Sequence, residues 1–416
     1  MRIAIFEPKF LTPPPNSASY LVIAQRQARS LARVGHKVIV LTEGNKAPIE
    51  EEANLTIYPL KGLLTSLSSL FSASRRKIPT FSHLSSPDIL LSAARKLKKA
   101  DVDVIYSCGT SFMASSTAFL GYMTNLPTVH YVFQYAGPWK WWRPYTDTFQ
   151  GFKVPLRYTI WEVMKNSLYQ PLRREFIHRW GLRHVTQIIA SSYNMRETLI
   201  NIGLNGENIT VIYPAVDIPP LTGAKSPQTQ LITYMGHLWQ GRGVLDLLMA
   251  FSKVAERHPE AKLMMATTNI EVLTEHYFNF LSDKYRLDSR IIHRGIVKDP
   301  GSEIMAPASV IVLPYRDAPS IKLIEAMAWG KPVVTTNIGW IPELITDGIN
   351  GFLVKPGDTD GLADKIEMVL ANRELAQAVG KKARETVEEK FSVDRNTGDL
   401  LAILHQAVEA KEKKSS

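Results

Sequence analysis

The chain has 416 residues, of which 45% are hydrophobic, and a formal net charge of +10. This length allows two or three domains with sizeable cores. We find no run of about 18 apolar residues, so we expect no transmembrane helix. The single cysteine, Cys108, excludes an internal disulfide and a cysteine-based metal cluster, and it fits a reducing, cytoplasmic setting.

The positive charge favours an anionic partner, and three classes fit it: nucleic acid, an anionic membrane surface and a phosphorylated substrate. The basic clusters are scattered along the chain, and we recognise no nucleic-acid-binding motif among them. We therefore expect no nucleic acid partner. A first strand that begins at Arg2 leaves no room for a signal peptide. We expect a cytoplasmic protein, with the inner face of the membrane as a candidate peripheral location.

The first half of the chain alternates strand and helix patterns. Residues 2–6 and 37–42 are apolar and β-branched, and helical spacing over 21–33 ends at Gly35, which predicts a βαβ unit. The loop over 11–19 is rich in proline and lacks a Gly-x-Gly-x-x-Gly pattern, which argues against a dehydrogenase. Later segments predict a helix over 90–100 and strands over 102–106, 128–133, 185–192 and 209–213.

Residues 139–183 interleave tryptophan and tyrosine with lysine and arginine. A basic, aromatic, amphipathic segment can lie in a membrane interface. It can equally pack on its own domain, because tryptophan rings and arginine stems bury apolar area. The sequence leaves both interpretations open.

The second half repeats the α/β pattern after a break. Residues 219–227 are rich in proline, glycine and serine and indicate a linker, and a new strand pattern begins at Leu231. We predict two doubly wound, Rossmann-like α/β domains facing a cleft, with ligand sites at the carboxyl ends of the strands. The expected domains are 1–217 and 218–395, followed by a C-terminal helix in 396–416 that returns to the first domain.

One strand–turn–helix unit carries the strongest functional signal. Residues 309–313 are apolar and β-branched, as in a buried parallel strand, and 333–336 predict the next strand. The pattern between them predicts a helix over 319–329. Pro319 suits the first helical position, and Gly330 suits the position just after the helix.

At the start of that helix, the N–H groups of Ser320, Ile321 and Lys322 would have no intrahelical acceptors. Together with the helix dipole they would form a socket for an anion, most naturally a phosphate. Glu325 lies about 7.5 Å further along the helix and leans towards its N-terminus, and Asp317 lies in the preceding turn. A phosphate socket and a carboxylate for hydroxyls fit a nucleotide. A capped core helix with a solvated Glu is the alternative, because such units are common.

Several segments, in order, resemble the retaining glycosyltransferases of family 4, which have the GT-B fold. Asp317-x7-Glu325 resembles the Glu-x7-Glu pattern that this family carries in a strand–turn–helix unit. The other matching segments are Gly35-His36-Lys37-Val38, Tyr213-Pro214-Ala215-Val216-Asp217, Gly236-His237-Leu238-Trp239-Gln240-Gly241-Arg242-Gly243-Val244, Gly339-x-x-x-Glu343 and Asp347-Gly348-x-Asn350-Gly351. The resemblance covers nearly the whole chain and implies an acceptor-side domain followed by a nucleotide-sugar domain.

The resemblance implies roles for residues of the strand–turn–helix unit. Backbone N–H groups of Ser320, Ile321 and Lys322 would hold the donor diphosphate, and Glu325 would bind the ribose hydroxyls. Asp317 stands where the family has Glu, one methylene longer, and would contact hydroxyls of the donor sugar.

Three further residues match positions of the family's site. Arg242 stands where the family has Lys and would neutralise the diphosphate, which a guanidinium can hold through two hydrogen bonds. His237 stands where the family has Arg and is a weaker cation at neutral pH. His130 matches a histidine near the donor sugar, and a core histidine is the alternative there. The resemblance implies no cofactor and no metal.

Our main hypothesis is a retaining hexosyltransferase that moves a sugar from a nucleotide-diphosphate sugar to an acceptor hydroxyl. The acceptor is unknown, and a lipid-linked or cell-surface glycan precursor is a candidate. One alternative keeps the fold and predicts a nucleotide-sugar epimerase or hydrolase. Another predicts a degenerate, non-catalytic member that binds a membrane or a partner protein.

Overall fold

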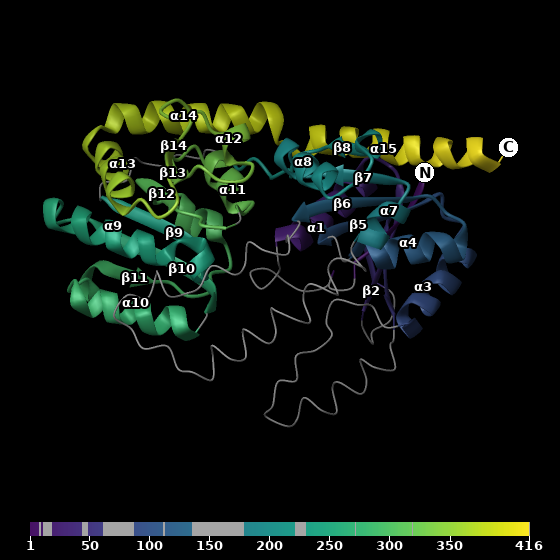
Figure 1. Ribbon diagram of the computed structural model, residues 1–416, viewed down its shortest axis with the longest axis horizontal. Helices are drawn as coiled ribbons and strands as arrows, with labels where there is room; N and C mark the ends of the chain where they lie inside the picture. The colour runs from purple at the N-terminus through teal and green to yellow at the C-terminus, as the bar shows by residue number, and fades with distance from the viewer. Residues whose placement is uncertain are drawn as a thin grey trace, which may run out of the picture.

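The computed structural model describes two α/β units that lie side by side (Figure 1). The described residues are 1–7, 10, 19–43, 49–60, 87–110, 113–134, 179–220, 230–270, 272–317 and 319–415. Within them, the first sheet has eight strands in the order β3-β4-β2-β1-β5-β6-β7-β8, and the second has six in the order β11-β10-β9-β12-β13-β14. We call the unit around the first sheet the N-terminal lobe and the unit around the second sheet the C-terminal lobe.

The N-terminal lobe alternates strands with helices, and its neighbouring strands are parallel except for the antiparallel pair β3 and β4. Its elements are β1 (Arg2–Phe6), α1 (Ser19–Arg33), β2 (Lys37–Glu43), β3 (Ile49–Glu52), β4 (Leu55–Leu60), α3 (Pro87–Lys99), β5 (Val104–Thr110), α4 (Met113–Thr124), β6 (Thr128–Gln134), α7 (Arg179–His184), β7 (Gln187–Ala190), α8 (Tyr193–Asn201), η4 (Gly206–Asn208) and β8 (Ile209–Val211).

The C-terminal lobe has only parallel strand pairs among its described residues. Its elements are β9 (Leu231–Leu238), η5 (Gln240–Arg242), α9 (Val244–Arg257), β10 (Lys262–Ile270), α10 (Val272–Lys284), η6 (Asp288–Arg290), β11 (Ile291–His293), η7 (Gly301–Met305), β12 (Val310–Leu313), α11 (Lys322–Ala328), β13 (Val333–Thr336), α12 (Ile341–Leu344), β14 (Phe352–Val354), α13 (Thr359–Ala371) and α14 (Arg373–Lys390).

The strands and helices that the sequence predicted are confirmed, with ends that differ by a few residues. The predicted helix over 319–329 is the main correction, because α11 is shorter, Lys322–Ala328. Most of the basic, aromatic segment 139–183 lies outside the described residues. Within the part of the chain that the structure describes, no helix is both long and apolar enough to cross a membrane.

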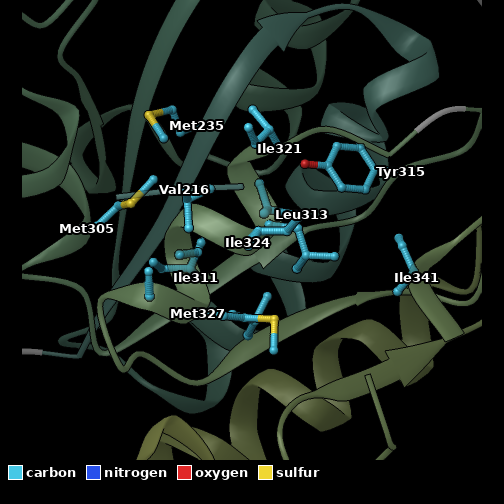
Figure 2. Close-up of a cluster of buried hydrophobic side chains, with 14 of the residues drawn as sticks. Val216, Met235, Met305, Ile311, Leu313, Tyr315, Ile321, Ile324, Met327 and Ile341 are labelled. Atoms are coloured by element: carbon cyan, nitrogen blue, oxygen red, sulfur yellow. The ribbon is translucent and has the colours of Figure 1, made fainter. Parts of the chain in front are cut away.

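The core of the C-terminal lobe explains why α11 lies where it does. All four residues of β12 are buried, as expected of a parallel strand covered on both faces. Figure 2 shows Ile321, Ile324 and Met327 beside Ile311 and Leu313 of β12, and all of them belong to one buried cluster. The spacing of three residues between these side chains places them on one face of the helix, so burial of that face fixes its position.

The two lobes are joined where the chain passes between them twice. The Val216 N–H donates to the carbonyl of Phe391 at 3.0 Å. The ring centroids of Tyr213 and Phe391 lie 5.2 Å apart, in an edge-to-face arrangement. After this crossing, α15 (Val393–Ser415) packs on α1, β5 and β6 of the N-terminal lobe. Our domain boundaries at residues 217 and 395 stay a prediction.

Polar side chains inside this contact hold α15 on α1. The Gln27 side-chain amide donates to Asn396 Oδ1 at 3.2 Å, and the hydroxyls of Thr397 and Ser30 lie 2.8 Å apart. The Asn396 amide also donates to the Tyr213 carbonyl at 2.7 Å. Because buried polar groups cost free energy unless they are paired, these bonds fix the register of α15 along α1.

Gly243 provides a test of how closely the loops of the C-terminal lobe approach each other. It has φ +68°, and a Cβ there would overlap the carbonyl of Pro314. Gly295 has a similar φ of +58° with open space around it. We expect Gly295→Ala to lower the free energy of unfolding by about 1 kcal/mol, the cost of left-handed backbone alone. Gly243→Ala should lower it by about 3 kcal/mol or more, because backbone must also move. Urea unfolding of both variants measures the difference, and equal losses would contradict the close approach.

Candidate functional site

The predicted site residues of the C-terminal lobe cluster at the carboxyl ends of two neighbouring strands. β9 ends at Leu238 and β12 at Leu313, and the two strands pair directly. The strand order reverses between them, since β10 and β11 follow on one side and β13 and β14 on the other. Open α/β sheets bind ligands outside the carboxyl ends of strands at such a reversal.

Two threonines of β13 hold the turn that follows β12. The Thr335 hydroxyl donates to the Leu313 carbonyl at 2.6 Å, and the Thr336 hydroxyl donates to the Tyr315 carbonyl at 2.5 Å. Both threonines are buried. The turn that leads to Asp317 is therefore fixed by the neighbouring strand.

The loop after β9 interlocks with the same turn. The N–H groups of Arg316 and Asp317 both donate to the Gly241 carbonyl, at 3.0 and 3.3 Å. A Cβ at Gly241 would overlap the end of the Asp317 side chain, so a larger residue there would displace the Asp317 carboxylate. The interlock places Arg242 and the exposed Asp317 beside each other, although they are far apart in the sequence.

Arg242 lies near two aromatic rings at this edge. Its guanidinium carbon is 5.6 Å from the Tyr315 ring centre and 6.0 Å from that of Trp239, distances at which a cation is attracted by the ring face. Burial raises the pKa of Tyr315, and the Arg242 charge opposes this rise. The phenol therefore stays neutral beside a partly exposed cation that can face an anion.

The start of α11 differs from the prediction. The helix begins at Lys322, and Pro319 and Ser320 lie outside it. Ile321 already has helical angles, φ −54° and ψ −20°, and the Leu323 N–H donates to the Ser320 carbonyl at 3.1 Å. This bond spans three residues, so the first turn is tighter than an α-helical turn. The Lys322 N–H faces the Ser320 hydroxyl at 3.4 Å.

Glu325 is held by two cations, one from each lobe. Its Oε2 accepts from Lys322 Nζ at 2.7 Å, and its Oε1 accepts from Arg26 Nη2 of α1 at 3.0 Å. Burial acts to raise the pKa of Glu325, but Lys322 and Arg26 outweigh burial and lower it. Glu325 is therefore an ionised carboxylate, as an acceptor of ligand hydroxyls must be.

His237 contributes no positive charge at neutral pH. Burial and the nearby Arg242 guanidinium lower its pKa below the ordinary value. The Tyr234 hydroxyl donates to the His237 carbonyl at 2.8 Å, which holds the backbone at the end of β9. At neutral pH the His237 imidazole is therefore an uncharged group that can form hydrogen bonds beside Arg242.

His130 is the one predicted site residue that belongs to the N-terminal lobe. The ring is fully buried in β6, and its Nδ1 lies 2.7 Å from the Ser107 hydroxyl, which lies 2.6 Å from that of Thr117. In this conformation no substrate can reach the ring. A catalytic role for His130 stays a prediction, and contact with a donor would require the N-terminal lobe to open around it.

Three features of the site were missed by the sequence analysis. Arg26 reaches Glu325 across 299 residues of chain, and no local pattern indicates that contact. Arg316 donates two hydrogen bonds of 2.6 Å to the buried Asp246 carboxylate, and this ion pair anchors the turn after β12 to α9.

Among the described residues, no cluster of three His, Cys, Asp or Glu side chains could hold a metal ion.

Glu343 is the third missed feature, and it links the lobes. Its carboxylate accepts from the N–H groups of Tyr193 and Asn194, at 2.9 and 2.6 Å, and from the Tyr213 hydroxyl at 2.5 Å. A carboxylate at the N-terminus of α8 satisfies free N–H groups and complements the helix dipole. The pattern Gly339-x-x-x-Glu343 marked this residue, but nothing in the sequence showed its partners.

Comparisons with known proteins match this architecture. Residues 22–218 match the model described as Glycosyltransferase Family 4, and residues 229–372 match the model described as Glycosyl transferases group 1. The two lobes of this chain are thus identified as a family 4 and a group 1 glycosyltransferase domain. The family resemblance that the motifs indicated is thereby confirmed.

Curated relatives of the family match part of the chain. N-acetyl-alpha-D-glucosaminyl L-malate synthase of Bacillus anthracis is 29% identical over 171 residues, 41% of this chain and 44% of the relative. Trehalose synthase of Thermococcus litoralis is 24% identical over 233 residues, 50% of this chain and 56% of the relative. The matched region thus spans about half the length of these relatives.

Several solved structures match nearly the whole chain. The Anabaena HepE structure in complex with UDP and glucose superposes with a TM-score of 0.71 at 16% identity, covering 97% of this chain and 99% of HepE. Sucrose-phosphate synthase from Thermosynechococcus elongatus gives a TM-score of 0.74 at 16% identity, covering 98% and 99%. At this identity the likeness shows the fold, and the predicted GT-B fold is confirmed.

The state of His237 gives the site a testable pH dependence. Because its pKa in the folded protein lies below the ordinary value of about 6.5, the unfolded chain takes up a proton first as the pH falls. The free energy of unfolding should therefore fall as the pH falls below about 6.5, and His237→Gln should reduce this loss. Urea unfolding at a series of pH values measures it, with His276→Gln, an exposed histidine of α10, as the control. If the free energy of unfolding of the His237 variant falls with pH as much as that of the wild type, protonation of His237 does not cause the fall.

Proposed function

We propose that this protein is a retaining glycosyltransferase that moves a sugar from a nucleotide-diphosphate sugar to an acceptor hydroxyl. The observation that carries the proposal is that Arg242 follows β9 and Glu325 follows β12, the two neighbouring strands between which the strand order reverses. One is a cation suited to a diphosphate, and the other is an ionised carboxylate suited to hydroxyls. A nucleoside diphosphate carries both kinds of group.

The proposed donor arrangement follows from these residues. Arg242, with the N–H groups of Ser320 and Ile321, binds the diphosphate, while the Lys322 N–H is directed at the Ser320 hydroxyl. Glu325 accepts hydrogen bonds from the ribose hydroxyls. The shorter Asp317, held against Gly241, reaches the hydroxyls of the sugar.

The proposed chemistry is electrostatic. The acceptor hydroxyl attacks the anomeric carbon on the face from which the nucleoside diphosphate departs, so the configuration is retained. As the bond to the phosphate oxygen breaks, negative charge grows on the diphosphate, and Arg242 stabilises it there. The departing phosphate oxygen takes the proton of the acceptor hydroxyl. The neutral His237 adds no charge and leaves Arg242 as the cation of this loop.

The relatives support the donor class. HepE was crystallised with UDP and with UDP-glucose, and the Bacillus anthracis relative is an N-acetyl-alpha-D-glucosaminyl L-malate synthase. We propose a nucleotide-linked hexose as the donor of this protein as well. For the acceptor, the net charge of +10 favours an anionic molecule such as a lipid-linked or cell-surface glycan precursor.

The two alternatives differ from this proposal in whether the protein binds a donor and whether it needs an acceptor to convert it. A nucleotide-sugar epimerase or hydrolase converts the donor without any acceptor, whereas a transferase needs one. A non-catalytic member binds no donor. A thermal-shift screen with UDP, GDP, ADP and their hexose conjugates, followed by donor consumption with and without acceptor, separates the three.

Glu325→Gln tests the role of the carboxylate. We expect it to weaken binding of the nucleoside diphosphate by about 10- to 100-fold, because hydrogen bonds to a charged group contribute about 1.5–3 kcal/mol. Calorimetric titration measures the affinity, and circular dichroism checks the fold.

The matched control is Glu388→Gln. Glu388 lies on α14 of the same lobe, where it pairs with Arg384, and its loss should leave the affinity unchanged. Native affinity in the Glu325 variant would remove the basis of the proposal.

A further inference from the structure

Arg26 lies in α1 of the N-terminal lobe and contacts three groups that are distant in the sequence. Its Nη2 donates to Glu325 Oε1 at 3.0 Å, its Nε donates to Asp217 Oδ2 at 2.9 Å, and its Nη1 faces the Ala215 carbonyl at 3.4 Å. The side chain is only 20% exposed, and that of Glu325 only 14%. One guanidinium therefore ties the C-terminal lobe to the end of the N-terminal lobe.

The contact leaves Glu325 able to accept further hydrogen bonds. Its two oxygens each accept one bond, from Arg26 and from Lys322. A carboxylate offers about four lone-pair sites, so about two remain for ligand hydroxyls. Arg26 and Lys322 bind different oxygens of the carboxylate, which fixes its orientation. They do not use all of its lone pairs.

We infer that Arg26 is a positioning residue for nucleotide recognition, which acts by orienting the Glu325 carboxylate from the opposite lobe. The inference rests on the proposed function, because it assigns Glu325 to the hydroxyls of the nucleotide. A long side chain such as Glu loses conformational freedom when it binds, and this loss opposes binding. The contacts of Arg26 and Lys322 restrict the side chain before the ligand arrives.

The inference also gives the N-terminal lobe a part in donor binding. Asp217 lies beside the crossing at Val216, and Arg26 joins it to Glu325 of α11. The ion pair can form only while the two lobes are close. Donor recognition is therefore strongest in the closed arrangement, in which the reacting groups are also shielded from water.

A double-mutant cycle tests whether Arg26 acts through Glu325. The variants are Arg26→Gln, Glu325→Gln and the double variant, and the probes are UDP, GDP and ADP in calorimetric titrations. We expect Arg26→Gln to weaken binding by about tenfold in the wild-type background, as expected for loss of a charged contact. In the Glu325→Gln background the same substitution should change the affinity little, because its target is gone.

The control is Arg33→Gln on the same helix. Arg33 is exposed and pairs with Glu52, so its loss removes the same charge and should leave the affinity unchanged. If Arg26→Gln weakens binding equally in both backgrounds, its role is structural and the inference is wrong. It is also wrong if the single variant binds like the wild type.

The failure of the proposed function gives a different result. In that case the wild-type protein itself binds none of the three nucleoside diphosphates. The inference then falls with the function, and the variants are not needed to show it.

Discussion

The site depends on the close approach of two loops at the carboxyl ends of β9 and β12. Gly243 allows the first loop to pass the Pro314 carbonyl, and Gly241 allows the turn to lie against it. A side chain at Gly243 would overlap the Pro314 backbone and push the loops apart, whereas one at Gly241 would displace the Asp317 carboxylate. Without this approach, Arg242 and Asp317 would not lie together at the carboxyl ends of β9 and β12.

Electrostatics then decide what this edge can bind. Two cations, Lys322 and Arg26, hold the Glu325 carboxylate, which stays ionised. A third cation, Arg242, lies after β9 beside the neutral His237. The arrangement favours a ligand that brings negative charge to Arg242 and hydroxyls to Glu325. Because Arg26 comes from the other lobe, the state of the carboxylate also depends on how the lobes are arranged.

The sequence predicted the layered architecture well, because β-branched runs and helical spacing alternate along the chain. It also located Arg242, Asp317 and Glu325 through short motifs. The start of α11 was placed too early, because Pro319 and Ser320 have the residue types of a helix start but remain outside the helix. Local pattern alone cannot decide between a helical turn and a tighter turn that precedes one.

The contacts that the sequence could not predict are those between distant segments. Arg26 looks like an ordinary charged residue of an amphipathic helix, and the motif that marked Glu343 did not show its partners. Only folding brings the two residues to partners 299 and 150 residues away. For His130, strand propensity placed the residue correctly in β6. Whether it faces a ligand or the core depends on the neighbours Ser107 and Thr117, which the sequence does not reveal.

The central claim is that the carboxyl ends of β9 and β12 form one nucleotide site. A crystal structure of the protein with the nucleoside diphosphate that it binds most tightly tests this claim directly. The account predicts diphosphate oxygens at Arg242 and a ribose hydroxyl about 2.5–3.0 Å from the Glu325 carboxylate. A nucleotide bound elsewhere, or one whose ribose points away from Glu325, would contradict it.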